Sequence, residues 1–369
     1  AFRNCDRLQD ISLPNTLKNI NQSAFYSCDS LKQITIPESV ETIGSDAFSY
    51  CKSLRSFSFP DNVKEISADV LSYCDSLRSV TLAEGTAKIN SNAFRNCPKL
   101  TECNFNQRTL TYIGSGAFAS TGFVNVTLPD EAVVYSSCFQ SCENLESINI
   151  PTATTYVPSN FVQNCKKLTS VQMHDGIRML NDYCFSGCSA LPSVELNDDI
   201  TGIGQRAFYQ CSVLELDALP SALTSIGAYA FGYCSAIKSL TIPQDVTVYD
   251  DVFSYSGLEE IDLSAAKSIG TGVFEYCTAL RTVVWNNSWT TIPNYTFYGC
   301  TSLESFPFYD GLETVKNSAF RYSGLKSASL HTGLNTIENY AFNQCGSLAS
   351  VDFPETLTSI GHSAFEKCY

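Results

Sequence analysis

The dipeptide Ala-Phe, or a close substitute for it, returns every 21 to 24 residues along the whole chain. Seventeen positions align in this way and span 363 residues in 16 intervals, a mean period of 22.7 residues. They are Phe2, Phe25, Phe48, Leu71, Phe94, Phe118, Phe139, Val162, Phe185, Phe208, Phe231, Phe253, Phe274, Phe297, Phe320, Phe342 and Phe365. A period of this length indicates a solenoid, in which each copy of a short unit packs against the copies before and after it.

The repeated unit reads A-F-x-x-C-x-x-L-x-x-I-x-I-P-x-x-V-x-x-I-G-x-x, and residues 47–69 show it clearly. Its L-x-x-I-x-I stretch alternates apolar and polar residues, which predicts a short strand that the following proline ends. Its x-x-A-F-x-x-C stretch predicts one short helical turn, with the Phe and the Cys on the same face. The Gly after the last Ile predicts a tight turn in which a positive φ is useful.

One unit cannot bury its own Leu, Ile and Phe side chains, so stacked copies must shield one another. The predicted fold is an α/β, curved solenoid of about 16 rungs, where one rung is one copy of about 23 residues. Helical turns pack about 8–10 Å apart and paired strands about 4.8 Å apart. We therefore expect short parallel strands on the inner face and short helical turns on the outer face. Residues 1–369 would form a single domain, and because both ends fall inside a unit we expect a fragment of a longer protein.

The motif L-x-x-I-x-I-P followed by A-F-x-x-C-x-x-L resembles the leucine-rich repeats of the bacterial surface-antigen type, the BspA-like subclass. The resemblance covers essentially the whole chain. It implies a leucine-rich-repeat solenoid in a secreted or cell-surface bacterial protein that adheres to proteins or other surfaces. It supplies no catalytic residue and no settled ligand site, and this interpretation requires no cofactor.

Composition and motif spacing argue against several other functions. The chain has 23 basic and 37 acidic residues, a net charge of −14, which disfavours nucleic acid as a partner of the chain as a whole. The three histidines are far apart and no Cys-x-x-Cys pair occurs, so we predict no metal site. No nucleophile lies in a recognisable pattern with a base, and we predict that the chain is not an enzyme. The uncharged run 218–237 contains a proline and two glycines, so we expect membrane attachment only through sequence outside this chain.

Fourteen of the 17 cysteines lie three residues after the aligned Phe. The three units without this cysteine carry Thr121-Gly122, Ser256-Gly257 and Ser323-Gly324 instead, and each has a turn one residue shorter. The coupling of cysteine loss to a shorter turn predicts a small buried thiol that packs under the turn. Disulfides are the alternative, although an odd count and the wide rung spacing of a helical edge disfavour them.

The candidate ligand-binding site comes from outward-facing positions. The residue after the Leu is basic on three adjacent rungs, and a hydroxyl residue of the predicted strand face stands three positions further on. These six residues are Lys32, Arg55, Arg78, Thr35, Ser58 and Thr81. Like charges on adjacent strands repel, so the basic stripe suggests a site for an anionic group, such as an acidic protein segment or a sulfated glycan. The alternative is that the three side chains splay apart and are screened by solvent.

Two further patterns stand beside the basic stripe. Late in the chain the same column alternates in sign, which predicts structural ion pairs between rungs: Lys238, Glu259, Arg281, Glu304 and Lys326. Tyrosines gather two residues before and two residues after the aligned Phe, and they form a second candidate surface. The alternative is that these rings only cap the edge of the core. Both tryptophans, Trp285 and Trp289, fall at inward positions and are predicted to be core.

The sequence therefore favours a non-enzymatic, extracellular or cell-surface protein that presents an extended solenoid face for adhesion. We expect its partners to be host or matrix proteins, or glycans. The alternative function is a passive structural spacer or scaffold that carries another domain of a longer protein. Binding of the isolated chain to matrix proteins or glycans would separate the two.

Overall fold

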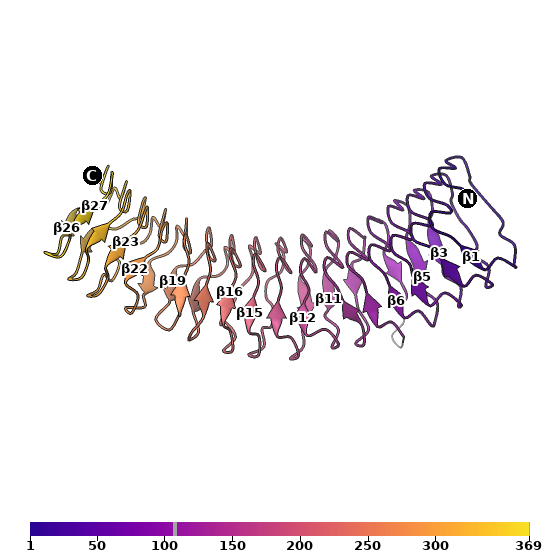
Figure 1. The fold of residues 1–369 in the computed structure, drawn as a ribbon, viewed down its shortest axis with the longest axis horizontal. Helices are drawn as coiled ribbons and strands as arrows, with labels where there is room; N and C mark the ends of the chain where they lie inside the picture. The colour runs from indigo at the N-terminus through magenta and orange to yellow at the C-terminus, as the bar shows by residue number, and fades with distance from the viewer. Residues whose placement is uncertain (106–108, 369) are drawn as a thin grey trace. The chain divides into compact units, whose positions relative to one another are not determined.

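The computed structural model describes residues 1–105 and 109–368. The chain forms two compact units: unit 1 holds residues 1–177 and 184–189, and unit 2 holds residues 178–183 and 190–369. In each unit, Figure 1 shows the strand arrows stacked beside one another, with a row of loops on the other side of the stack. That the whole chain is a single domain stays a prediction.

The first set of strands lies where the L-x-x-I-x-I alternation predicts them. In unit 1 these strands are β3 (Ser56–Ser58), β5 (Ser79–Thr81), β7 (Glu102–Cys103), β9 (Asn125–Val126), β11 (Ser147–Asn149) and β13 (Ser170–Gln172). In unit 2 they are β17 (Ser239–Thr241), β19 (Glu260–Asp262), β21 (Thr282–Val284), β24 (Ser327–Ser329) and β26 (Ser350–Asp352). Neighbouring rungs pair in parallel, so that Phe57 lies opposite Val80 and Ser58 opposite Thr81. The prediction of short parallel strands is confirmed.

A second set of strands, which the sequence analysis did not predict, lies at the V-x-x-I-G stretch. In unit 1 these strands are β1 (Asn19–Ile20), β2 (Thr42–Ile43), β4 (Glu65–Ile66), β6 (Lys88–Ile89), β8 (Tyr112–Ile113), β10 (Val133–Val134) and β12 (Tyr156–Val157). In unit 2 they are β14 (Met179–Leu180), β15 (Gly202–Ile203), β16 (Ser225–Ile226), β18 (Thr247–Val248), β20 (Ser268–Ile269), β22 (Thr291–Ile292), β23 (Thr314–Val315), β25 (Thr336–Ile337) and β27 (Ser359–Ile360). With only two residues each, they are too short for an alternation to be read from the sequence.

The predicted helical turns are wrong, because none of the described residues is in a helix. In the x-x-A-F-x-x-C stretch, alternate N–H groups donate to the next rung: Phe25 N to Ala47 O at 2.7 Å and Ser27 N to Ser49 O at 2.8 Å. The N–H groups between them close turns within the rung, as Cys28 N does to Phe25 O at 3.3 Å. The fold is therefore an all-β solenoid with a third hydrogen-bonded ladder. The wide helical edge, our reason for expecting strands on the inner face, is absent from the described chain.

Two left-handed residues in each turn explain why it is not helical. Twenty-nine of the 30 non-glycine residues with positive φ lie two residues before or two residues after the aligned Phe. Before the Phe they are Ser23, Asp46, Asp69, Asn92, Ser137, Asn160, Tyr183, Arg206, Tyr229, Asp251, Tyr295, Ser318, Tyr340 and Ser363. After it they are Asn4, Ser27, Tyr50, Tyr73, Asn96, Ser120, Ser141, Asn164, Gln210, Tyr233, Tyr255, Tyr276, Tyr322, Gln344 and Lys367. A left-handed residue costs about 1 kcal/mol, and it lets alternate N–H groups face the neighbouring rung instead of their own.

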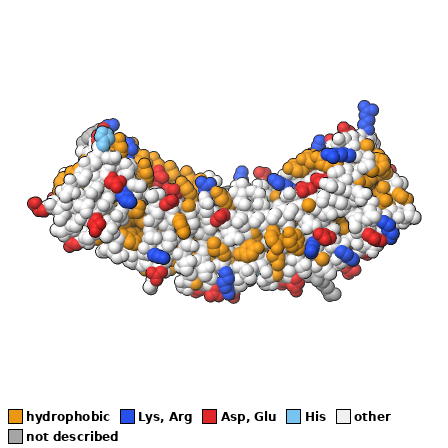
Figure 2. All heavy atoms as spheres, viewed as in Figure 1, with side chains coloured by type: hydrophobic (Ala, Val, Ile, Leu, Met, Phe, Trp, Pro, Cys, Tyr) orange, Lys and Arg blue, Asp and Glu red, His pale blue; other side chains and the backbone are white. Residues whose placement is uncertain are grey.

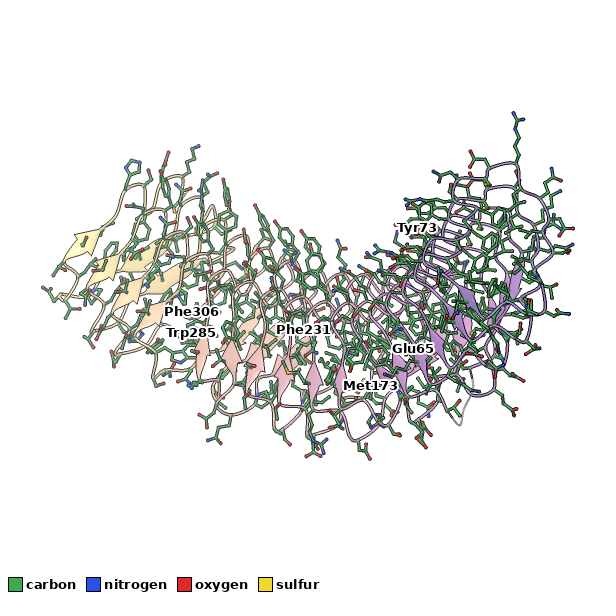
Figure 3. All side chains as sticks on the ribbon, turned by 45° about the vertical axis from the view of Figure 1, so that its right-hand side comes forward. Glu65, Tyr73, Met173, Phe231, Trp285 and Phe306 are labelled. Atoms are coloured by element: carbon green, nitrogen blue, oxygen red, sulfur yellow. The ribbon has the colours of Figure 1, made fainter. Side chains whose placement is uncertain are left out.

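The aligned Phe column forms the core of each unit. Phe48, Phe231 and Phe320 are fully buried, and the Phe231 ring stacks on Phe208 and Phe253 with ring centroids 5.6 Å away on both sides. Figure 3 shows Phe231 inside the stack. Rung by rung, the packing follows the period read from the sequence.

The Gly of the I-G pair is not at a positive φ, so that prediction is wrong. At Gly227 the reason for glycine is close approach instead. A methyl group there would lie 2.5 Å from the backbone nitrogen of Gln205 in the preceding rung. Glycine lets the two backbones pass without a clash.

The slot cysteines are hydrogen-bond donors between rungs. At least twelve of their thiols in the described chain donate to the carbonyl of the residue in the aligned Phe column one rung earlier, at Sγ···O distances of 3.0–3.3 Å. Cys51 to Phe25 at 3.2 Å is an example. In one of the rungs without the cysteine, the Thr121 hydroxyl takes the position of the thiol and donates to Phe118 O at 2.7 Å. All 17 cysteines are free thiols, and 14 of them are buried.

We expect the native protein to resist thiol labelling. Burial raises the pKa of Cys51 and of Cys277 to about 12, so only about one thiol in ten thousand is ionised at pH 8. Burial also disfavours the Cys142 thiolate, but hydrogen bonds from the Cys165 thiol and the Thr121 hydroxyl outweigh it and lower the pKa of Cys142. Cys142 is fully buried, so a reagent cannot reach it without opening of the fold.

The measurement is the rate of reaction with a water-soluble disulfide reagent at pH 8. The partly exposed thiols of Cys5 and Cys368 should react within minutes. Burial raises the pKa of Cys103 strongly, so this thiol, like the other 14, should react only as the chain unfolds. Full denaturation should release all 17. Rapid reaction of many more than two thiols in the native state would contradict the packing role.

Candidate binding surfaces

The basic stripe lies where the sequence predicts it, on three consecutive rungs of unit 1. Arg55 N donates to Lys32 O at 3.3 Å, and Arg78 N donates to Arg55 O at 2.8 Å. All three side chains are exposed. Within residues 1–105 and 109–368, no carboxylate lies within 4.0 Å of their charged groups. The three cations therefore come from adjacent backbones, and none of them has a counter-ion among the described residues.

The hydroxyl residues of the candidate site lie beside the stripe on the strand face. Ser58 in β3 and Thr81 in β5 are register partners and both are exposed. Thr35 is also exposed, in a rung that has no strand at this position. Two open polar hollows flank Ser58: one of about 310 Å³ includes Thr35, and one of about 490 Å³ includes Thr81.

Two asparagines of the strand face, which the sequence analysis did not single out, bond to the preceding rung, and one of them, Asn104, lines the larger hollow. The Asn104 side chain accepts from Leu82 N at 2.6 Å and donates to Leu82 O at 3.1 Å. Asn149 makes the same two bonds to Leu128, at 2.6 and 2.9 Å. Each amide takes the place of a backbone partner from the next rung. These bonds could have been suspected from the sequence, because Asn104 and Asn149 stand at a strand position where many other rungs carry Ser or Thr.

In unit 2 the same column forms ion pairs, as its alternating signs predict. Glu259 lies between two cations, with N···O distances of 3.8 Å to Lys238 and 4.0 Å to Arg281. Lys326 pairs with Glu304 at 2.6 Å. These pairs are exposed and each contributes less than about 1 kcal/mol. The prediction of structural pairs is confirmed. In the described part of unit 1, by contrast, the cations of the same column form no ion pair.

The two units also differ in charge. Unit 1 has 14 basic and 17 acidic residues, whereas unit 2 has 9 and 20. The strand face of unit 2 carries an open hollow of about 280 Å³ lined in part by Asp217, Glu260 and Asp262. Most of the net negative charge of the protein is therefore on unit 2.

Tyrosines form a continuous strip on the loop side of unit 2. One ring from each of six consecutive rungs takes part, and neighbouring ring centroids are 4.7–5.4 Å apart. We call these six residues the tyrosine strip: Tyr209, Tyr233, Tyr255, Tyr276, Tyr298 and Tyr322. Figure 2, in which tyrosine shares the colour of the hydrophobic residues, shows such side chains along the loop side of unit 2. In unit 1 a shorter row includes Tyr73, which Figure 3 shows on the loop side.

Each end of the tyrosine strip holds an arginine of the protein itself. The Arg206 guanidinium carbon lies 5.3 Å from the ring centroid of Tyr209 and 4.9 Å from that of Tyr229. The Arg321 guanidinium carbon lies 5.0 Å from the centroid of Tyr322. The Nε of both arginines is buried and has no hydrogen-bond partner in the described chain. The tyrosines therefore hold each guanidinium mainly through cation–π contact.

Two partly buried carboxylates lie beside the middle of the strip. Burial raises the pKa of Glu275, and the nearby Asp251 carboxylate raises it further. Burial also raises the pKa of Asp251, although its hydrogen bond with Tyr229 acts in the opposite direction. Burial and that hydrogen bond raise the pKa of Tyr229 to about 12, so Tyr229 stays protonated at neutral pH and donates to Asp251.

The structure shows no metal site among the described residues, where no group of three His, Cys, Asp or Glu side chains could hold a metal ion. The Nε2 atom of His174 lies 3.1 Å from Thr154 O.

The two tryptophans differ in burial. Trp285 is core, 4 % exposed, with Nε1 donating to Tyr309 Oη at 3.1 Å. Trp289 is only half-buried and lines an open hollow, so its core prediction is wrong. Among the described residues, no helix has the length and apolar composition needed to cross a membrane.

Comparisons with known proteins agree on the repeat. The family model described as BspA type leucine rich repeat region matches residues 1–101, 64–188, 155–281 and 267–369. A leucine-rich repeat protein structure from Bacteroides ovatus is 23% identical, with a TM-score of 0.73, over 97% of this chain and 86% of that one. One from Eubacterium ventriosum is 21% identical, with a TM-score of 0.50, over 85% and 83%. A search of curated proteins finds no match.

Proposed function

Because the chain belongs to the BspA-type leucine-rich repeat family, we propose that it is a non-enzymatic binding protein of the bacterial cell surface or its surroundings. It presents an extended solenoid face to protein or glycan partners. The basic stripe of unit 1 and the adjoining hydroxyl residues form its ligand-binding surface. The ligand is anionic.

The observation that carries this proposal is that no carboxylate of the described residues forms an ion pair with the basic stripe. Stacking of rungs holds Lys32, Arg55 and Arg78 side by side, and three like charges so placed repel one another. The equivalent column of unit 2 relieves this repulsion with the Glu259 and Glu304 ion pairs. An anionic ligand would supply the same relief in unit 1, and the hydroxyl groups beside the stripe would donate hydrogen bonds to it.

The test uses heparin as a sulfated glycan and poly-L-glutamate as an acidic polypeptide. We expect at least one of them to bind at low salt and to dissociate as salt is added, because the contacts are exposed and screened. In the triple variant Lys32→Gln, Arg55→Gln, Arg78→Gln we expect the affinity to fall by about tenfold or more. Fluorescence anisotropy of the labelled ligand measures this, and the preferred probe separates glycan from protein partners.

The matched control removes three cations from the same column of unit 2, by Lys238→Gln, Arg281→Gln and Lys326→Gln. The change of net charge is identical, so the control should keep the affinity of the unaltered protein within about threefold if the stripe is the site. Equal losses in both triple variants would show a general charge effect and contradict the site. Failure of both probes to bind would favour the alternative function, a passive spacer that carries another domain.

A further inference from the structure

We propose that the tyrosine strip of unit 2 is a second binding surface, which docks an arginine-rich segment of a partner protein. This surface is separate from the basic stripe, lies in the other unit and takes ligands of the opposite charge. The argument rests on what the strip already holds, on what lies beside its middle, and on the charge of the unit.

The strip already binds guanidinium groups of its own chain. Arg206 lies against three tyrosine rings, with its Nη1 3.4 Å from the Tyr183 hydroxyl. Arg321 lies against three others, with its Nη2 3.4 Å from the Tyr322 hydroxyl. Neither arginine pairs with a carboxylate in the described chain, so tyrosine rings and hydroxyls suffice to hold a guanidinium at both ends of the strip.

The middle of the strip offers tyrosine hydroxyl groups and two carboxylates to a cation, in place of open ring faces, and no Lys or Arg of the described chain occupies it. The rings of Tyr233, Tyr255 and Tyr276 stack at 4.7 and 4.8 Å, which leaves their edges and hydroxyl groups to face solvent. Tyr233 and Tyr255 are 37 % and 40 % exposed. In the described chain, no Lys or Arg lies within ion-pair distance of Asp251 or Glu275.

Carboxylates make the middle of the strip a stronger cation site than its ends. Asp251 and Glu275 lie close together, since a methyl group added at Gly272 would contact both carboxylates, and the Asp251 charge disfavours that of Glu275. A guanidinium between them would remove that repulsion. It would donate two or more charge-assisted hydrogen bonds, to the carboxylates and to the hydroxyls beside them. With 9 basic and 20 acidic residues, unit 2 would also attract a cationic segment from a distance.

Three tyrosines of the strip have a strained backbone, so stability of the fold does not explain why tyrosine occurs there. Tyr233, Tyr255 and Tyr276 have φ values of 62°, 59° and 55°, in a region that bulky residues rarely adopt. Elsewhere the same column holds Asn96 and Asn164, which tolerate this conformation. Four of six consecutive rungs of unit 2 carry the less suitable residue there, and exposed tyrosine is a favoured binding residue.

The experiment measures binding of a fluorescently labelled hexa-arginine peptide at low salt. One variant pair removes the charges, by Asp251→Asn and Glu275→Gln. A second pair removes two rings, by Tyr233→Asn and Tyr255→Asn. Both should preserve the fold. Asn is the native residue at positions equivalent to Asp251, Tyr233 and Tyr255 and tolerates the left-handed conformation, and Gln is the native residue at positions equivalent to Glu275. We expect each pair to weaken binding of the peptide at least tenfold, with circular dichroism unchanged.

The matched control is Glu260→Gln with Asp262→Asn, which makes the same change of charge in the acidic hollow on the strand face of unit 2. We expect it to change the affinity by less than threefold. Loss of binding in the control equal to that in the strip variants would overturn the proposal, because it would indicate attraction by net charge only. Absence of hexa-arginine binding by the unaltered protein would also overturn it.

Discussion

The replacement Phe231→Ala should lower the free energy of unfolding of unit 2 by about 4 kcal/mol, through lost burial and the cavity left behind. Phe231 is fully buried, and its ring stacks on Phe208 and Phe253 at 5.6 Å on either side. Removal of the ring therefore weakens two rung interfaces at once. Because each rung contacts only its neighbours, the loss should concentrate there. Urea denaturation measures the total, and hydrogen–deuterium exchange should rise most between residues 208 and 253.

The matched control is Phe231→Leu. Leucine is the native residue of this column at Leu71, which is also fully buried. Phe231→Leu should cost about 1–1.5 kcal/mol, since it keeps most of the buried volume. If the alanine variant proved no less stable than the leucine variant, the Phe column would not be the main support of the stack.

The second large effect is expected from Gly257→Ala. An added methyl group at Gly257 would lie 1.9 Å from the carbonyl oxygen of Ser235 in the preceding rung, so one of the two backbones must move. The shift would also disturb the hydrogen bond from Gly257 N to Cys234 O at 3.1 Å. We expect a loss of about 2–3 kcal/mol, the usual range for overpacking. Urea denaturation with circular dichroism measures it.

Alanine should destabilise the other two shortened turns in the same way, since methyl groups at Gly122 and Gly324 would lie 2.5 and 2.2 Å from backbone carbonyl oxygens. Gly85→Ala is the control, because the atoms nearest to its added methyl belong to the flexible end of the Lys64 side chain. It should change the stability by less than about 1 kcal/mol. A Gly257→Ala variant as stable as Gly85→Ala would show that the shortened turn tolerates a side chain.

Much of the fold can be predicted from the sequence because the period fixes which residues meet. The aligned Phe column, the strands at L-x-x-I-x-I and the adjacency of Lys32, Arg55 and Arg78 all follow from counting residues. The alternation of charge from Lys238 to Lys326 likewise predicts its ion pairs. Such features depend only on register, which a repeat of nearly constant length preserves.

The turns could not be predicted in the same way, because Phe and Cys three residues apart share a face in a β-turn as well as in a helix. The distinguishing signal is the pair of columns flanking the Phe, where residues that tolerate positive φ recur, such as Asn92, Asn96, Asn160 and Asn164. The tyrosines among them conceal this pattern. The contacts of Arg206 and Arg321 were missed for a related reason, since they depend on side-chain directions that the turn conformation sets.

The three ladders of hydrogen bonds give this architecture an evolutionary freedom. Most rungs offer their successor the same donors and acceptors that they receive from their predecessor, and the thiol of Cys51 donates to Phe25 O as that of Cys300 donates to Phe274 O. A gene segment encoding one period can thus be duplicated or deleted without orphaning a polar group. The length of the solenoid can then change with the number of copies. Its surface chemistry can change independently, by point substitutions in the outward columns.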